Sequence, residues 1–183
     1  MIRAVLDADV LYPLPLRDTL LSAAHEGCFQ PVWSAEILDE MIRNLLADGR
    51  IKPAGATALR RDLDKHFEDA LTRDYRPLIA KMKNHPKDRH VAACAVAGEA
   101  NLIVTSNVRD FTLLPDGIVA VTPDDFLLRL MAETPELLRA ALDAQSARLK
   151  RKPMDVPAVL GLLSIVAPKF VAAWLAAEGR LAL

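Results

Sequence analysis

The fold is decided by the opening stretch IRAVLDAD, residues 2–9. Residues 2–6 form a short apolar run interrupted only by Arg3, which predicts a buried strand ending at Asp7. Further patterns predict strands at 29–33, 102–104 and 118–121, and helices from Pro13 to near Gly27 and at 34–46, 56–71 and 88–99. This alternation predicts a parallel α/β sheet, whose working residues lie beyond the carboxyl ends of its strands.

The pattern after Pro123 is only helical, with helices expected at about 124–132, 135–149 and twice between 155 and 179. A basic run before Pro153 marks a linker and contains Arg148, Lys150, Arg151 and Lys152. The apolar stretch 156–177 is interrupted by two prolines, a glycine and a lysine. We therefore expect buried or docking helices here rather than a membrane span.

The composition limits the classes of protein to which the chain can belong. With 52% hydrophobic and 26% charged residues, the 183-residue chain can bury a sizeable core. A net charge of -1 gives no overall attraction for nucleic acid, so any surface that binds it must be a local patch. Cys28 and Cys94 lie in no CxxC motif, which argues against zinc or disulfides and favours a reducing cytoplasm.

Two carboxylates, Asp7 and Asp9, follow the first predicted strand. Charges so close repel each other, and an enzyme that used both would normally supply a cation. Taken alone, the pair favours the simpler interpretation of one cap and one solvated side chain. Asp88 aligns with the apolar stripe of the helix after it, which is equally compatible with a metal ligand and with a helix-dipole interaction.

Other acidic and polar residues are less informative. Periodicity does not choose among Glu36, Asp39 and Glu40 on the helix that Ser34 caps. Asn107 and Asp110 follow the strand at 102–104, where either residue also suits a turn. No metal-ligand spacing is formed by the four histidines, His25, His66, His85 and His90.

Together, four segments resemble motifs of the PIN-domain family, which includes VapC-type toxins: Ala4–Leu11, Pro31–Glu40, Asp88–Ala95 and Ile103–Phe111. The resemblance implies a metal site formed by Asp7, Glu40, Asp88 and Asp110. It departs from the usual family pattern at Asp9, where the family has Asn, and at Asn107, where the family often has Asp. Which of Asn107 and Asp110 meets the metal therefore stays open.

The resemblance also implies a fold and an activity. The fold would be a three-layer α/β/α domain with a short central parallel sheet over residues 1–125, followed by a C-terminal helical extension at 126–183. The activity would be Mg²⁺- or Mn²⁺-dependent cleavage of RNA, leaving 5′-phosphate and 3′-hydroxyl ends. Asn107 joins the expected catalytic residues, and the expected substrate-binding residues are Thr105, Lys83, Lys87 and Arg89.

The resemblance further implies partners: an RNA substrate, a cognate antitoxin and a second copy in a homodimer. The C-terminal extension carries one stripe at helical spacing, formed by Phe170, Val171, Trp174 and Leu175. Such a stripe more often packs within its own chain. A role in a dimer or antitoxin interface is the alternative.

Two other functions compete. Residues 7–11, 104–107 and 122–125 imitate motifs of haloacid-dehalogenase-like phosphatases, but residues 108–123 lack the lysine that family needs. The second alternative is a PIN-like module that has lost catalysis and acts only in interactions, which the departures at Asp9 and Asn107 leave open.

Overall fold

The computed structural model describes residues 1–148 and 155–181 and divides into two compact units. Unit 1 comprises Met1–Tyr12 and Gln30–Val121, and unit 2 comprises Pro13–Phe29 and Thr122–Leu183. Residues 13–29 thus group with the C-terminal helices, and the expected boundary after residue 125 stays a prediction. Of the basic run, Lys150, Arg151 and Lys152 lie outside the described residues.

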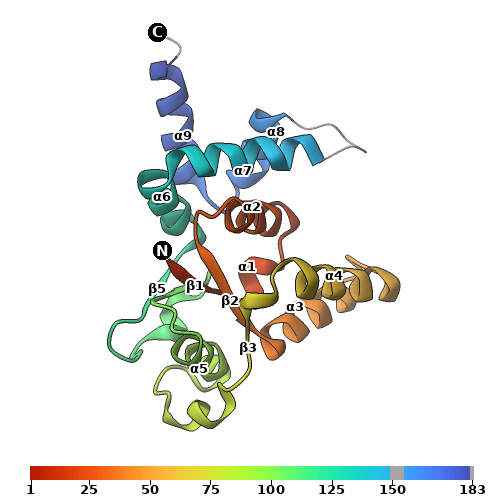
Figure 1. The fold of residues 1–183 in the computed structure, drawn as a ribbon, viewed down its shortest axis with the longest axis vertical. Coiled ribbons are helices and arrows are strands. Elements are labelled where there is room, and N and C mark those ends of the chain that lie inside the picture. Colours follow the sequence, from red (N-terminus) through yellow and green to blue (C-terminus); the bar gives the residue numbers. More distant parts are fainter. Residues whose placement is uncertain (149–154, 182–183) are drawn as a thin grey trace. The chain divides into compact units, whose positions relative to one another are not determined.

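Unit 1 is built on a parallel sheet with the strand order β3-β2-β1-β4-β5 (Figure 1). Its strands are β1 (Arg3–Leu6), β2 (Gln30–Ser34), β3 (Leu71–Thr72), β4 (Leu102–Val104) and β5 (Val119–Val121). Val5 of β1 lies between Val32 of β2 and Ile103 of β4, and all three are buried. The predicted parallel sheet is confirmed, while the two-residue β3 is too short to show a periodicity.

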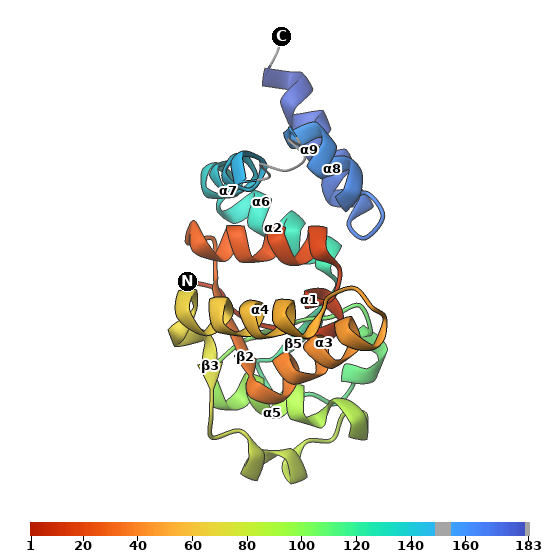
Figure 2. The same cartoon turned by 90° about the vertical axis from the view of Figure 1, so that its right-hand side faces the viewer.

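Helices cover both faces of this sheet. The α-helices of unit 1 are α1 (Ala8–Leu11), α3 (Ala35–Ala47), α4 (Pro53–His66) and α5 (Arg89–Ala97). Four 3₁₀ turns lie in the connecting segments of this unit: η1 (Glu68–Ala70), η2 (Arg76–Lys81), η3 (Pro86–Asp88) and η4 (Val108–Phe111). From β1 the chain proceeds to β2 and β3, and it then returns to β4 on the other side of β1. Right-handed crossovers therefore place α3 and α5 on opposite faces (Figure 2). The expected three-layer arrangement is observed.

Local signals explain where helices begin and end. Ser34 caps α3 as predicted, because its Oγ accepts a hydrogen bond of 3.2 Å from the Ile37 N–H. The helix expected at 56–71 instead runs from Pro53 to His66. A proline at the first helical position suits the earlier start. The earlier end brings the Phe67 ring edge-on to Trp33 of β2, with 5.6 Å between centroids.

Unit 2 is helical, as predicted for its C-terminal part. Its helices are α2 (Leu14–His25), α6 (Pro123–Glu133), α7 (Pro135–Arg148), α8 (Val156–Leu163) and α9 (Pro168–Leu181). The buried Thr19 hydroxyl of α2 donates to Gln145 Oε1 of α7 at 2.9 Å. Within the described ranges, no helix is long and apolar enough to cross a membrane.

The start of α9 is held by Asp124 of α6. Its carboxylate accepts hydrogen bonds from the backbone N–H groups of Lys169 and Phe170, at 3.1 and 2.8 Å. Asp125 pairs with the Lys169 ammonium at 3.0 Å. Phe170 and Trp174 are buried, and their ring centroids lie 5.8 Å apart in a tilted arrangement, so most of the predicted apolar stripe packs within its own unit. Leu175 is exposed.

Candidate metal centre

The carboxyl ends of β1 and β4 lie side by side at the point where the strand order reverses. From β1 the sheet extends to β2 and β3 on one side and to β4 and β5 on the other. Asp7 follows β1 and Thr105 follows β4, and the Asp7 N–H donates to the Val104 carbonyl at 3.1 Å. The Thr105 hydroxyl donates to Asp7 Oδ2 at 2.9 Å, and both side chains are buried. This edge is where ligands bind in open parallel sheets.

Asp9 lies at the same edge, in the first turn of α1. Its Oδ2 accepts from the Ser106 N–H at 2.9 Å, and Asp7 Oδ1 caps the helix by accepting from the Ala8 N–H at 2.7 Å. The other oxygen of Asp9, Oδ1, is buried and has no hydrogen-bond partner among the described residues. The simpler interpretation expected one cap and one solvated side chain. Asp7 is the cap, but Asp9 is not fully solvated, because one of its oxygens is buried.

Burial and charge repulsion together raise the pKa values of Asp7 and Asp88. Burial, followed by the negative charge of Asp9, raises the pKa of Asp7 to about 7, and Asp88 adds to the increase. The hydrogen bonds from Thr105 and Ala8 oppose it. Burial and then the charge of Asp110 raise the pKa of Asp88. The four carboxylates that interact electrostatically are therefore Asp7 after β1, Asp9 in α1, Asp88 in η3 and Asp110 in η4. A divalent cation would relieve the repulsion between them.

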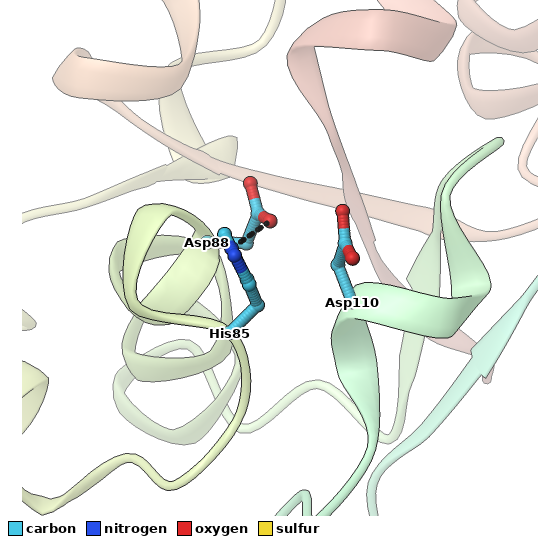
Figure 3. Close-up of side chains that lie close together, drawn as sticks. All are labelled: His85, Asp88 and Asp110. Atoms are coloured by element: carbon cyan, nitrogen blue, oxygen red, sulfur yellow. Dashed lines mark ion pairs between the residues drawn. The ribbon is translucent and has the colours of Figure 1, made fainter.

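Among the residues that the structure describes, His85, Asp88 and Asp110 form a compact group of possible ligands (Figure 3). One ligand atom from each lies within 4.8 Å of the other two, and His85 Nδ1 is 3.6 Å from Asp88 Oδ2. The sequence shows no metal-ligand spacing among the histidines, but the structure places His85 beside two acids that could hold an ion together with it. Its spacing to Asp88 is visible in the sequence, but Asp110 arrives from η4 and completes the group only in space.

Glu40 lies on α3, and its Oε2 is 3.7 Å from Nε2 of His90 on α5. The other two acids of this helix are engaged elsewhere: Glu36 accepts from the Tyr75 hydroxyl at 3.1 Å, and Asp39 pairs with Arg60 at 2.7 Å. The structure therefore distinguishes Glu40 from its neighbours, which periodicity does not. The compact group of possible ligands does not include it, so its role as a ligand stays a prediction.

The expected substrate-binding residues lie around these acids. Asn107 is exposed, and its backbone N–H donates to the Thr105 hydroxyl oxygen at 3.1 Å. Lys83 and Lys87 are exposed, and Lys87 acts electrostatically on Asp88. Arg89 is half-buried, with Nε donating to the Asn84 carbonyl at 3.2 Å. Of the two candidates that follow β4, Asp110 is the one grouped with Asp88.

The residues fit a divalent cation. Carboxylate oxygens are the donors that Mg²⁺ and Mn²⁺ prefer, and here the charges of Asp9 and Asp88 raise the pKa of Asp7 while the charge of Asp110 raises that of Asp88. The unpartnered Oδ1 of Asp9 is a further buried oxygen that needs a donor or a cation. Asp7, Asp88 and Asp110 could hold the ion, with Asp9 beside them.

Comparisons with known proteins agree with this geometry. The family model described as "PIN domain" matches residues 3–109, and the model described as "VapC50 C-terminal domain" matches residues 123–175. A protein of Mycobacterium tuberculosis (strain ATCC 25618 / H37Rv), named "Putative ribonuclease VapC50", is 39% identical over 101 residues. The match covers 54% of this chain and 60% of that relative's length. Because the first model covers more than half of the sequence, the chain belongs to the PIN domain family.

Proposed function

We propose that this protein is a divalent-metal-dependent endoribonuclease and the toxin of a toxin–antitoxin pair. The observation that carries the proposal is the grouping of Asp88 and Asp110 with His85 within 4.8 Å, together with the electrostatic effect of Asp88 on Asp7 at the end of β1. Neighbouring acids whose charges raise the pKa of Asp7 and of Asp88 have a chemical use where a cation joins them. Membership of the PIN family and similarity to a relative named as a ribonuclease support RNA as the substrate.

In this proposal Asp7, Glu40, Asp88 and Asp110 hold Mg²⁺ or Mn²⁺. The bound ion supplies a water of lowered pKa and neutralises charge on the scissile phosphate. Thr105 fixes the orientation of Asp7 through its hydroxyl, and this bond prevents the carboxylate from turning toward solvent. Asn107 is exposed beside Thr105, where its amide can orient the substrate.

The RNA backbone is the part of the substrate that Lys83, Lys87 and Arg89 would contact. The ammonium groups of Lys83 and Lys87 are free to meet phosphates because both side chains are exposed. Arg89 has one N–H committed to Asn84, which leaves its other donors for the substrate. Such contacts position RNA without reading its sequence.

The proposed partners are a cognate antitoxin and a second copy of the chain. Unit 2 exposes apolar side chains that could join such an interface, including Ile165 at 82% and Leu175 at 54% exposure. Light scattering of full-length Ile165→Asp and Leu175→Asp should show a smaller species than the unsubstituted protein. Leu113→Asp is the matched control, since Leu113 is also exposed but belongs to unit 1. A monomeric parent protein would refute the homodimer.

Cleavage of end-labelled RNA, with and without chelator, tests the proposed activity. Asp7→Asn and Asp88→Asn should lower the rate by more than the roughly 10–100-fold typical of losing a group that only supports a metal ligand. Asp39→Asn is the control, because Asp39 is an exposed acid paired with Arg60. Mn²⁺ binding without RNA cleavage would instead identify an inactive interaction module.

The phosphatase alternative is disfavoured by a specific observation. Its acidic motif would need Asp124 and Asp125, yet Asp124 caps α9 and Asp125 pairs with Lys169. Hydrolysis of a phosphate monoester without RNA cleavage, or a phosphoaspartate trapped at Asp7, would restore that alternative.

A further inference from the structure

The backbone of His85 is fixed by both other members of the compact group. Its N–H donates to the Asp110 carbonyl at 2.9 Å, and its carbonyl accepts from the Asp88 N–H at 2.9 Å. Pro86 follows and restricts the backbone at the start of η3. These constraints hold the imidazole at the rim of the acidic site although its side chain is 54% exposed.

The imidazole is not satisfied by the acid beside it. The 3.6 Å between His85 Nδ1 and Asp88 Oδ2 exceeds a hydrogen bond, and Figure 3 shows the ring beside the Asp88 carboxylate, with that of Asp110 across from them. Nitrogen and oxygen donors grouped within 4.8 Å match what a transition-metal ion needs.

A second, independent observation comes from His90. Its ring is buried, and Nδ1 lies 3.0 Å from the Lys87 carbonyl, which can only accept a hydrogen bond. The other ring nitrogen, Nε2, lies 3.7 Å from Glu40 Oε2, beyond hydrogen-bond distance, and has no hydrogen-bond partner among the described residues. A buried nitrogen that lacks a hydrogen-bond partner and lies beside a carboxylate marks a place that a bound water or a cation would fill.

We propose that His85 is a nitrogen ligand of the metal site, which makes the site a mixed nitrogen–oxygen centre that prefers Mn²⁺ to Mg²⁺. The inference rests on the proposed function for the presence of a divalent ion. Mg²⁺ has little affinity for imidazole, whereas Mn²⁺ accepts both carboxylate oxygen and imidazole nitrogen. Replacing the imidazole with a carboxylate should therefore remove the preference without removing the site.

Electron spin echo spectroscopy of Mn²⁺ bound to the full-length protein tests this directly, because it detects ¹⁴N attached to the ion. We expect a nitrogen signal in the unsubstituted protein and in His66→Asn, since His66 lies on α4 and bonds to the Asp62 carbonyl. The signal should disappear in His85→Asn and His85→Asp. By calorimetry, His85→Asn should lower Mn²⁺ affinity about tenfold or more, and Mg²⁺ affinity far less.

The outcomes separate this inference from the proposed function. Bound Mn²⁺ without a nitrogen signal, or a signal that survives in His85→Asn but is lost in His90→Asn, overturns the role of His85 and leaves the nuclease proposal intact. Failure of the unsubstituted protein to bind either ion overturns both. An unchanged ratio of Mn²⁺ to Mg²⁺ affinity in a folded His85→Asp variant also contradicts the inference.

Discussion

The Thr105 hydroxyl donates to Asp7 Oδ2 at 2.9 Å, and this bond joins the ends of two strands that are 98 residues apart in the sequence. The same hydroxyl oxygen accepts from the Asn107 N–H at 3.1 Å. Thr105 therefore links the leading acid of the site to the turn that carries Asn107 and, three residues later, Asp110.

Removing this hydroxyl should harm both stability and activity. Thr105→Val keeps the shape of the side chain but leaves Oδ2 of Asp7 without the Thr105 donor, so we expect a loss of about 1–3 kcal/mol in unfolding free energy. Thr105→Ser keeps the donor and is the control for activity. Urea unfolding and RNA cleavage measure the two effects, and equal behaviour of the two variants would contradict the role assigned to the hydroxyl.

The raised pKa of Asp7 predicts how stability changes with pH in metal-free protein. Below the unfolded-state value of 3.8 both states are protonated, and above about 7 both are ionised. In between, the folded state binds more protons, so the free energy of unfolding falls as pH rises from about 4 to 7. Melting curves in chelator should show this decline, and Asp7→Asn should make it shallower. An equally steep decline in Asp7→Asn would exclude Asp7 as its source.

A divalent ion should reverse that trend, because it competes with the proton for Asp7. Mn²⁺ should thus raise the melting temperature more at pH 8 than at pH 5. An increase that does not depend on pH would show that the ion binds away from the titrating acids.

Lys87 should contribute to RNA affinity through phosphate alone. In an Asp7→Asn background that prevents cleavage, Lys87→Gln should weaken binding to all RNA sequences and reduce the salt slope by about 1. Lys65→Gln, an exposed lysine on α4, is the control. Binding that is unchanged in slope and strength would remove Lys87 from the RNA-binding surface.

Two glycines should respond to alanine with opposite signs. A Cβ on Gly98 would lie 2.5 Å from Val32 Cγ1 and 2.8 Å from Thr72 Oγ1, so Gly98→Ala should cost about 1–3 kcal/mol through overpacking against β2 and β3. Gly161 lies within α8 with nothing within 4 Å of a new Cβ, and Gly161→Ala should stabilise by about 0.5–1 kcal/mol. Thermal unfolding measures both, and a neutral Gly98→Ala would contradict the packing described for unit 1.

The sequence predicts those parts of the structure that depend on residues close together along the chain. The Ser34 cap, the strands before Asp7 and Thr105 and the C-terminal helices follow from local patterns, and all are observed. The one-turn helix α1 and the two-residue β3 were missed because neither is long enough to show a period.

The site itself is less accessible from sequence. Asp9 reads locally as a solvated acid, and only the pairing of β1 with β4 brings Ser106 and Thr105 to it. His85 reads as an exposed basic side chain, and its relation to Asp110 depends on a backbone hydrogen bond between two distant turns. Periodicity does not separate Glu40 from Glu36 and Asp39. The family resemblance points to Glu40, and the structure adds that Glu36 and Asp39 are engaged with Tyr75 and Arg60.

The central claim is that the acids at the ends of β1 and β4 hold a divalent ion. Anomalous diffraction from crystals of the full-length protein soaked in Mn²⁺ tests it most directly. We expect an anomalous peak within coordination distance of the Asp7 and Asp88 carboxylates. A soaked crystal with no peak there, or with manganese bound only at other carboxylates, would contradict it.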